Sequence, residues 1–586
     1  MENPKENKLE KMRHSASHVL AHAVLKLYPD TKLGIGPAIE DGFYYDFEFS
    51  QPIEEKDLKE IENEMKKIIK RKLQITQTFM KRKDAIKYLK EIGQDYKLEL
   101  LDEIPDKDIS FFVTGDSEFV DMCRGPHVED TGDVGVIKLI KTAGAYWKGD
   151  ETKKMLTRIY GSAFETKEEL KDYLSKLENA ERFNHRKLGK QLKLYAIIPE
   201  IGQGLPVWLP RGYTIRRILE NYMFDLERKH GYQHILTPHI NRGELFNISG
   251  HLNFYKDSMY PPINIDGEDY YLKPMNCPAG FMVYNMELKS YRDLPFKLGE
   301  FGTVYRYEKT GELHGLQRVR GFTQNDAHIF STPEQLEESI KEILDLLDIF
   351  YKDVGFDKYK FRLSLSDRES NPTKYAGDIE KWRFAEEILR KALVDRGVEF
   401  EEMPGDAAFY GPKIDVQAVN VYGKQDSIST IQLDFNMANK FNIKYIDDKG
   451  QEKQPYVIHR ALIGSFERFF AFLIEHHGGD FPLWLAPDQV TIIPISDKHI
   501  KHAKEIYNLL NSNDIRVTLD DRGKSMQSKI RDAEKLKIPY LVIIGDKEIE
   551  TETVSIRSRV NKEIGLMKQQ EFLEYLQEEI RTKKHK

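Results

Sequence analysis

Cysteine is scarce in this chain, which has only Cys123 and Cys277 among its 586 residues. Two cysteines cannot build a disulfide framework of the kind that stabilises small secreted proteins, and we expect both thiols to be reduced. A lone cysteine is usually a small buried apolar residue. Cys123 stands four residues before His127, however, and this pairing favours a metal ligand or a reactive thiol.

Long apolar runs are missing as well. The best candidate, ALIGSFERFFAFLI, is interrupted by Glu467 and Arg468, whereas a membrane span needs about 18 uninterrupted apolar residues. The N-terminal segment MENPKENKLEKMRHS has no apolar core of the kind found in a secretory signal. We therefore expect a cytoplasmic protein without a membrane partner.

The chain also lacks an excess of positive charge, since its formal net charge is -7. This argues only weakly against a nucleic acid partner, because a large protein can gather basic residues on one face while its total charge stays negative. One such gathering is RFNHRKLGKQLKLY, residues 182–195, which is equally typical of a solvated helix face.

The length predicts roughly three or four domains of about 150 residues each. Residues 1–165 mix short helices and strands, and residues 166–190 read as one charged helix that connects two domains. In residues 191–485, aromatic and β-branched runs separated by turns predict a large sheet with surrounding helices. Residues 486–586 alternate short apolar strands with helical segments, which predicts an α/β domain with a partly parallel sheet.

Local patterns predict several single elements. Residues 55–73 have apolar positions at helical spacing and predict an amphipathic helix. The segment GIGPAIEDGFYYDFEF predicts a loop that leads into an aromatic strand or hairpin, and a long helix is expected to begin near Tyr213. In the last domain the expected helices are 498–512 and 524–536.

The segment RHSASHVLAHA places His14, His18 and His22 at four-residue intervals, so that a helix would align them along one stripe. This segment is half of a metal site completed by Cys123 and His127, a catalytic site without metal, or a polar helix face. The spacing does not decide among the three.

Two central motifs suit anion binding. Arg306 ends an apolar strand, and a guanidinium there can make bidentate contacts to a phosphate or carboxylate. Further on, a strand that carries His459 runs into a helix with Gly464, Ser465 and Arg468 near its start, where an anion would meet both the helix dipole and a second arginine.

Five ordered motifs resemble those of class II aminoacyl-tRNA synthetases, most closely the threonyl-tRNA synthetase family. They are LPRGYTIRRILENYM, NCP, QRVRGFTQNDAHIF, FYGPKID with TIQLDF, and HRALIGSFERF, and the resemblance covers nearly the whole chain. It implies an α+β multidomain protein with an antiparallel class II sheet core, an α+β editing domain and a C-terminal α/β anticodon-binding domain. It also implies a homodimer formed around residues 212–242, which include Pro238.

The implied activity is ATP-dependent attachment of L-threonine to tRNA(Thr), with Mg²⁺ accompanying ATP. Cys277, His328 and His459 match the family's zinc ligands and leave a fourth position open, as in a catalytic zinc site. A zinc that takes the threonine hydroxyl rejects valine, but serine keeps the hydroxyl and lacks only a methyl group, worth about 1–3 kcal/mol. Serine is therefore expected to be misactivated.

The family removes this error at a second site that hydrolyses seryl-tRNA. The matching residues are His14, His18, Cys123 and His127, with Asp121 and Lys97 as neighbours, whereas His22 remains a structural helix residue. A related fold in alanyl-tRNA synthetase binds metal through such a quartet. We favour metal-free hydrolysis here and keep zinc as the alternative.

The resemblance assigns the remaining site residues. Arg306 and Arg468 would hold ATP and stabilise charge on its α-phosphoryl group. Glu308 would contact adenine or its surroundings, and Arg318 matches the second motif arginine. Glu548 and Arg557 would read anticodon bases. The substrate pocket would contain Gln324, Asp326, Tyr410, Lys413, Gln432 and Ser465.

Two departures from the family stand out. The editing motif begins at residue 13, so the usual N-terminal ubiquitin-like domain does not fit, and Ser427 replaces a glutamine that contacts ATP in many members. Two other functions remain open: a catalytically inactive synthetase-like RNA-binding regulator, and a prolyl-tRNA synthetase. Damage to Arg306, Arg468 or the zinc triad would favour the regulator, and prolyl enzymes lack the Cys/His/His set.

Overall fold

The fold is described from a computed structural model that covers residues 4–150, 152–368, 370–371, 374–375, 378–561 and 563–584. The chain divides into two compact units, residues 1–178 and 179–586, which are considered separately. None of the helices described is both long and apolar enough to cross a membrane.

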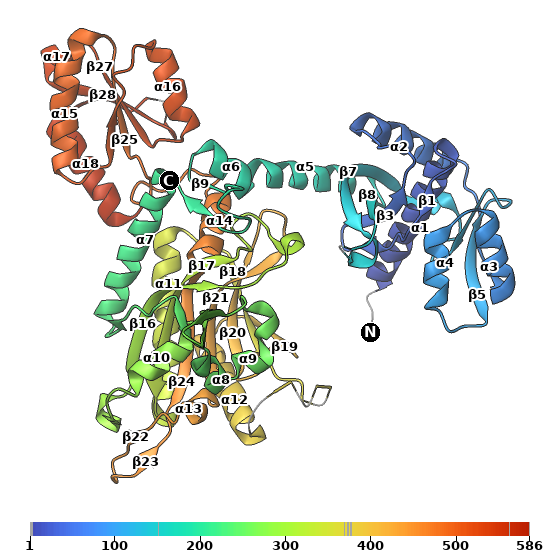
Figure 1. The fold of residues 1–586 in the computed structure, drawn as a ribbon. Helices are drawn as coiled ribbons and strands as arrows, with labels where there is room; N and C mark the ends of the chain where they lie inside the picture. The colour runs from blue at the N-terminus through green and yellow to red at the C-terminus, as the bar shows by residue number, and fades with distance from the viewer. Residues whose placement is uncertain are drawn as a thin grey trace. The chain divides into compact units, whose positions relative to one another are not determined.

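In the first unit, the long helix α1 (Pro4–Leu27) packs with α2 (Glu55–Lys70) against an antiparallel sheet (Figure 1). The predicted amphipathic helix is therefore confirmed, although it ends at Lys70. The predicted hairpin is also confirmed, because β2 pairs antiparallel with β3. The strands of this sheet are β1 (Lys32–Leu33), β2 (Ala38–Ile39), β3 (Gly42–Glu48), β7 (Val136–Tyr146) and β8 (Met155–Phe164).

A smaller sheet with two helices completes this unit. Its strand order is β4-β5-β6, and all its pairs are antiparallel. The elements are β4 (Ile75–Lys81), α3 (Arg82–Glu91), α4 (Asp95–Asp102), β5 (Asp108–Thr114) and β6 (Phe119–Met122).

The single connecting helix predicted over 166–190 is wrong in one respect. The segment forms α5 (Lys167–Phe183) and a separate α6 (His185–Gln191), divided at Asn184. The Asn184 backbone is non-helical, and its side chain accepts a hydrogen bond from the backbone N–H of Arg186. Asparagine caps a new helix in this way more readily than it continues an old one.

The second unit is built on an eight-stranded sheet of order β11-β16-β17-β24-β21-β20-β18-β19. All neighbouring pairs are antiparallel except the two at the edges, β11 with β16 and β18 with β19. The strands are β11 (Gln233–His234), β16 (Phe296–Tyr305), β17 (Gly321–Ser331), β18 (Tyr359–Leu365), β19 (Phe400–Pro404), β20 (Lys413–Val419), β21 (Gln425–Asp434) and β24 (Tyr456–Ser465).

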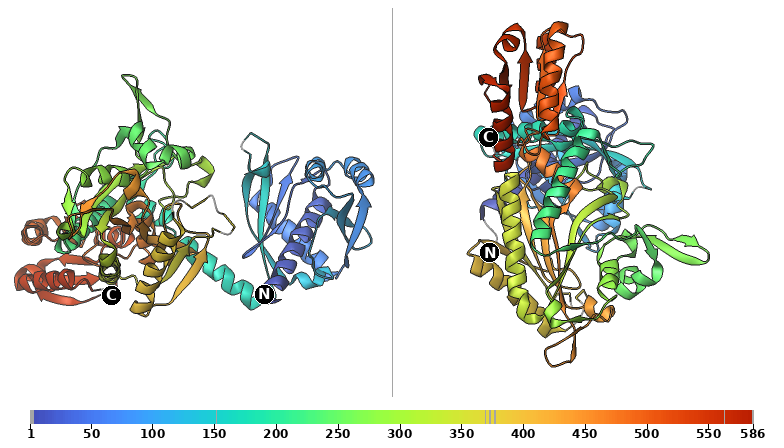
Figure 2. Two further views of the ribbon diagram at one scale, coloured as in Figure 1. Left: turned by 90° about the horizontal axis from the view of Figure 1, so that it is seen from below. Right: turned by 90° about the vertical axis from the view of Figure 1, so that its left-hand side faces the viewer.

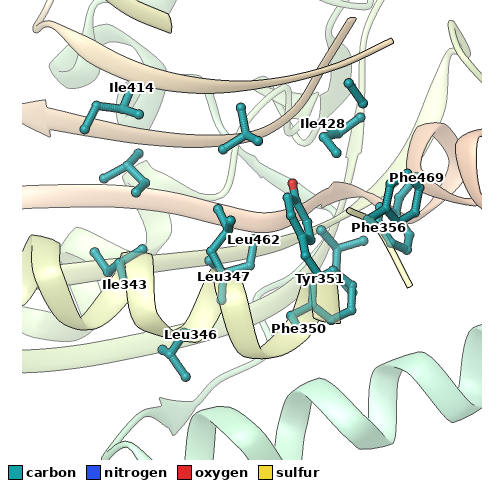
Figure 3. Packing of buried hydrophobic residues seen from close by; sticks show 14 of the residues in the cluster. Ile343, Leu346, Leu347, Phe350, Tyr351, Phe356, Ile414, Ile428, Leu462 and Phe469 are labelled. Carbon is teal, nitrogen blue, oxygen red and sulfur yellow. The ribbon is translucent and has the colours of Figure 1, made fainter. Parts of the chain in front are cut away.

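Helices cover one face of this sheet and leave the other for the site. Ile343, Leu347 and Tyr351 of α11 (Leu336–Val354) pack against Ile428 and Leu462 of the strands (Figure 3). The α11 helix lies beside α7 (Pro210–Lys229) (Figures 1 and 2), and other helices on this sheet are α12 (Ile379–Arg396) and α14 (Phe466–His476).

Helix α7 begins three residues before the predicted start near Tyr213. Pro210 occupies its first turn, where the missing N–H of proline leaves no hydrogen bond unmade. The helix is therefore longer at its N-terminus than the apolar periodicity suggested.

The last domain has a five-stranded sheet of order β26-β25-β27-β28-β29, with β25 parallel to its two neighbours and the other pairs antiparallel. The predicted partly parallel α/β arrangement is confirmed. Its elements are β25 (Val490–Pro494), α15 (Ile500–Ser512), β26 (Val517–Leu519), α16 (Met526–Lys535), β27 (Tyr540–Ile544), α17 (Asp546–Thr551), β28 (Thr553–Ser558), β29 (Gly565–Lys568) and α18 (Gln569–Thr582).

Candidate active site and a second histidine cluster

The open face of the large sheet carries a pocket of about 290 Å³. Alternate residues of a strand point to the same face, and β17 contributes Phe322, Gln324 and Asp326 in this way. Residues of β21 and β24 line the pocket as well. Most of the predicted substrate residues line this pocket, namely Arg306, Glu308, Arg318, Gln324, Asp326, Tyr410, Gln432, Ser465 and Arg468. Lys413 lies opposite Gln432 on β20, where its ammonium is paired with Asp415 at 2.5 Å.

Cys277, His328 and His459 meet at one end of the pocket, with their ligand atoms all within 4.8 Å of one another. His328 on β17 lies directly opposite His459 on β24, and Cys277 begins α10 (Cys277–Tyr284). The buried Nε2 atom of His328 has no hydrogen-bond partner. His459 Nε2 lies 3.1 Å from a carboxylate oxygen of Asp434, which leaves Nδ1 for a ligand.

These three residues fit a zinc ion. A thiolate with two imidazoles is a typical zinc donor set, a carboxylate behind a ligating histidine fixes its orientation, and the orphaned nitrogen of His328 gains a partner. Cys277 and His459 also line the pocket, so a fourth position would face a substrate.

Burial dominates the electrostatics at this end of the pocket. It raises the pKa of the Cys277 thiol and, for Asp326, raises the pKa to about 6. The pKa of His328 is lowered well below its usual value by burial and by the neighbouring His459. A bound divalent cation would favour the thiolate and the carboxylate, and it would require the neutral imidazole.

Two arginines flank the pocket. The Nε–H of Arg306 donates to the Pro274 carbonyl at 3.3 Å, and that of Arg468 donates to the Gln317 carbonyl at 3.1 Å. Arg468 stands in the first turn of α14, whose N-cap is Ser465. Two guanidinium groups beside a helix N-terminus have the charge and hydrogen-bond donors that suit phosphate groups.

The charged residues next to these arginines form ion pairs with each other. Arg318 donates to Glu308 at 2.8 Å and to Glu312 at 3.1 Å. Ser427, where the family glutamine is absent, lines the pocket and accepts a hydrogen bond of 2.7 Å from the Gln417 amide.

The sequence reasoning missed some polar residues at this site. Asn276 donates to Asp326 at 3.2 Å, and Gln417 supports Ser427. Asn276 belongs to the NCP motif and could have been named from it. The alternation of polar residues in KIDVQ, which places Lys413, Asp415 and Gln417 on one face of β20, is the signal that could have identified Gln417.

In the first unit, a second cluster joins α1 to the segment after β6. The Sγ atom of Cys123 lies 3.3 Å from His14 Nε2 and 3.4 Å from His127 Nε2, and the His18 and His127 ring centroids are 4.3 Å apart. One ligand atom from each of these four residues lies within 4.8 Å of the others. His22 stands apart from the cluster and stacks on Phe119.

Lys97 and Asp121 lie beside this cluster as a buried ion pair of 2.7 Å. The second oxygen of Asp121 accepts a hydrogen bond from the Tyr45 hydroxyl at 2.6 Å and lies 3.8 Å from His18 Nε2. Tyr45 is a residue that sequence reasoning missed, because an aromatic in a buried strand is normally a core residue.

Burial favours the neutral forms of the side chains in this cluster. It lowers the pKa values of His14, His18 and His127 and raises the pKa of Cys123 to about 11. A neutral imidazole can accept a hydrogen bond from water and so orient it. A groove of about 900 Å³ reaches Cys123 and Arg124 and is also lined by Phe79 and Lys107, so an extended ligand could approach the cluster.

Both predicted anticodon residues were expected on strands, and the structure places only one of them there. Arg557 lies on β28, but Glu548 lies in the helix α17 rather than on a strand. One of its carboxylate oxygens accepts a hydrogen bond of 2.9 Å from the backbone N–H of Gly545, so that it caps the helix and is largely buried. The cause is the sequence Gly-Asp-Lys-Glu, which places an acidic side chain three residues into the helix.

Three segments match known families. Residues 260–477 match the tRNA synthetase class II core domain (G, H, P, S and T), residues 489–579 match an anticodon binding domain, and residues 109–160 match the threonyl and alanyl tRNA synthetase second additional domain. The expected fold class, a class II core with an additional α+β domain and an anticodon-binding domain, is confirmed.

Full-length relatives agree with these matches. A threonine–tRNA ligase of Geobacillus sp. (strain WCH70) is 46% identical over 98% of this chain and 89% of its own length. One of Dehalococcoides mccartyi is 45% identical over 98% of this chain and 97% of its own length. The crystal structure of the RNA binding domain of threonyl-tRNA synthetase from Cryptosporidium parvum Iowa II is 35% identical, has a TM-score of 0.63, and covers 67% of this chain and 98% of its own. The inactive-regulator and prolyl alternatives are not favoured, and the chain belongs to the threonine–tRNA ligase family of class II aminoacyl-tRNA synthetases.

Proposed function

We propose that this protein activates L-threonine with ATP and transfers it to tRNA(Thr). The observation that carries the proposal is the union, in one pocket, of a Cys/His/His set that fits zinc with two arginines that suit the phosphates of ATP. A catalytically inactive binding protein would not need both the Cys/His/His set and the two arginines.

At the amino acid end, Cys277, His328 and His459 would hold one Zn²⁺ per subunit. When bound, it supplies a Lewis acid for the threonine amino and hydroxyl groups. The half-buried Asp326, held by Asn276, would orient the amino group by its charge. In this proposal the pocket is completed by Gln324, Tyr410, Lys413 and Gln432.

At the nucleotide end, a threonine carboxylate oxygen attacks the α-phosphorus and pyrophosphate leaves. Arg306 and Arg468 hold the phosphates and stabilise the charge that develops, and Mg²⁺ accompanies ATP. Ser465 caps α14 and thereby keeps Arg468 in the first turn. Glu308 and Arg318 line the nucleotide side as a bonded pair.

The second cluster would hydrolyse seryl-tRNA. A pocket that tests one methyl group separates serine from threonine by roughly 10- to 200-fold, so a further sieve is needed for greater accuracy. His14, His18, Cys123 and His127 would position water and the tRNA terminus without metal, while Asp121, held by Lys97 and Tyr45, orients His18.

The remaining assignments concern partners and organisation. Glu548 and Arg557 would read the anticodon of tRNA(Thr), and the protein would act in the cytoplasm as a homodimer. The exposed apolar side chains in the segment 212–242 support an interface there, and they include Tyr213, Phe224, Leu236 and Ile240. The proposed domains are editing (1–165), linker (166–190), catalytic (191–485) and anticodon-binding (486–586).

The test is ATP–pyrophosphate exchange with threonine, serine, valine and proline. We expect strong exchange with threonine, weaker exchange with serine and nearly none with valine. Exchange driven by proline and not by threonine would overturn the proposal.

A further inference from the structure

The basic segment of residues 182–195 is not explained by the proposed function. Its charged side chains at Arg186, Lys187 and Lys190 are exposed, as expected of a solvated face. His185 differs, because it is completely buried at the joint between α5 and α6. A buried histidine within an exposed basic run calls for a partner inside the protein.

Both ring nitrogens of His185 are engaged. Nε2 accepts a hydrogen bond of 3.2 Å from the backbone N–H of Leu316, so the ring proton resides on Nδ1. That Nδ1–H donates to a carboxylate oxygen of Glu475 at 2.6 Å, and the same oxygen accepts from the backbone N–H of His185. The imidazole therefore has one orientation and one tautomer.

Leu316 belongs to a closed turn that carries pocket residues. The backbones of His314 and Arg318 exchange hydrogen bonds of 3.1 and 3.3 Å across this turn. The next residue, Gln317, offers the carbonyl that accepts from Arg468, and Arg318 pairs with Glu308. The atom held by His185 is thus one residue away from the support of Arg468.

The fit between His185 and this turn is close. Gly315 has a φ of +51°, and a Cβ atom added to it would lie 2.2 Å from His185 Nε2. On the other side of the joint, the Asn184 amide donates to the Tyr422 hydroxyl at 2.7 Å, just before β21 begins. Ser427 and Ile428 of β21 are among the residues that line the pocket.

Glu475 extends the connection along α14. It stands near the C-terminal end of this helix, whereas Arg468 stands in the first turn. His185 therefore contacts both supports of Arg468, namely the helix that bears it and the turn that holds its Nε–H.

We propose that His185 is a positioning residue for adenylate formation. By accepting from Leu316 and donating to Glu475, it fixes the 314–318 turn against α14 and so places Arg468 and Arg318 for the nucleotide. The inference rests on the proposed function, because it assumes that this pocket binds ATP. His185 itself does not reach the substrate.

The experiment compares His185→Leu, which keeps bulk but has no acceptor, with His185→Gln, which offers a side-chain oxygen. We expect the leucine variant to raise the KM for ATP about tenfold while the KM for threonine changes less than twofold, since loss of a buried hydrogen bond shifts the turn on the nucleotide side. On a logarithmic scale, the rise in the KM for ATP is expected to be at most half as large in the glutamine variant as in the leucine variant. A merely structural role would lower kcat through loss of folded protein and leave both KM values unchanged.

Two further variants complete the test. Gly315→Ala crowds the turn while retaining the histidine, and the same rise in KM for ATP is expected even where His185→Leu fails to fold. Lys187→Ala, at an exposed neighbour, should behave like wild type. Wild-type KM for ATP in both His185→Leu and Gly315→Ala would overturn the inference, as would equal defects in the leucine and glutamine variants. Threonine-dependent exchange by the wild type tests the proposed function independently.

Discussion

Cys277 is the residue on which the zinc hypothesis depends most directly. Replacing it with serine exchanges a thiolate for a hydroxyl, which is a much poorer zinc ligand at neutral pH. We expect Cys277→Ser to lose bound zinc and to lower threonine-dependent exchange at least a hundredfold. The fold should persist, because Cys277 lies at the pocket and serine is similar in size.

The matched control is Cys123→Ser, which changes the only other cysteine of the chain. It lies in the first unit, so zinc content and exchange should stay at wild-type values. Metal content by mass spectrometry and exchange kinetics are the measurements. Full activity of Cys277→Ser without bound metal would end the zinc hypothesis.

Single residues also show where sequence reasoning stops. The zinc triad could not have been found from local spacing, because its members are far apart in the chain and only the pairing of β17 with β24 brings His328 beside His459. Resemblance to a family supplied what spacing could not. Tyr45 and Gln417 escaped notice because their roles depend on contacts with Asp121 and Ser427 from other strands.

The junction of β24 with α14 is the element that places Arg468. Gly464 there has a φ of +63°, and an added Cβ atom would lie 2.5 Å from the backbone oxygen of Ile428. Backbone atoms cannot move aside cheaply, so β21 or the start of α14 would have to shift. We expect Gly464→Ala to reduce exchange at least tenfold, mainly through weaker ATP binding.

The control for this change is Gly311→Ala, in the loop between Arg306 and Arg318. A Cβ atom at Gly311 would meet nothing within 4 Å, and its backbone does not lie in the left-handed region. Exchange by this variant should match the wild type. Equal activity of the two alanine variants would contradict a special role for the junction.

Helix boundaries were less predictable than helix existence. The division at Asn184 was missed because charged residues continue at helical spacing on both sides, while the capping hydrogen bond to Arg186 decides the break. The start of α7 was missed because Pro210 has no apolar signal, yet suits a first turn. In the last domain, the helices and strands could be predicted because turn residues flank them and short apolar strands alternate with helical segments.

The two proposed sites, for synthesis and for editing, lie in different compact units of the chain. The zinc triad and both arginines belong to residues 179–586, whereas the histidine cluster belongs to residues 1–178. Composition and length predicted several domains, but which distant segments share a site followed only from the family resemblance and the sheet pairings. Mutations in one unit should therefore leave the chemistry of the other nearly intact.

The variant that tests this separation is the double change His14→Ala and His18→Ala. Both side chains lie on α1 and face Cys123 and His127, so their removal opens the cluster without touching the larger unit. Threonine-dependent exchange and threonyl-tRNA formation are expected to change less than twofold. Deacylation of preformed seryl-tRNA should fall at least a hundredfold, and seryl-tRNA should accumulate during synthesis, because the synthetic pocket rejects serine only by the value of one methyl group.

Chelation separates the two explanations of the cluster. A site that positions water through neutral imidazoles keeps its deacylation rate after metal is removed, whereas a zinc-dependent site loses it. We expect wild-type protein treated with a chelator to lose threonine activation and to retain hydrolysis of seryl-tRNA. His22→Ala is the matched control on the same helix, since His22 stacks on Phe119 outside the cluster, and it should hydrolyse normally. Unimpaired hydrolysis by the double variant would remove the editing assignment, and loss of hydrolysis on chelation would assign the cluster to zinc.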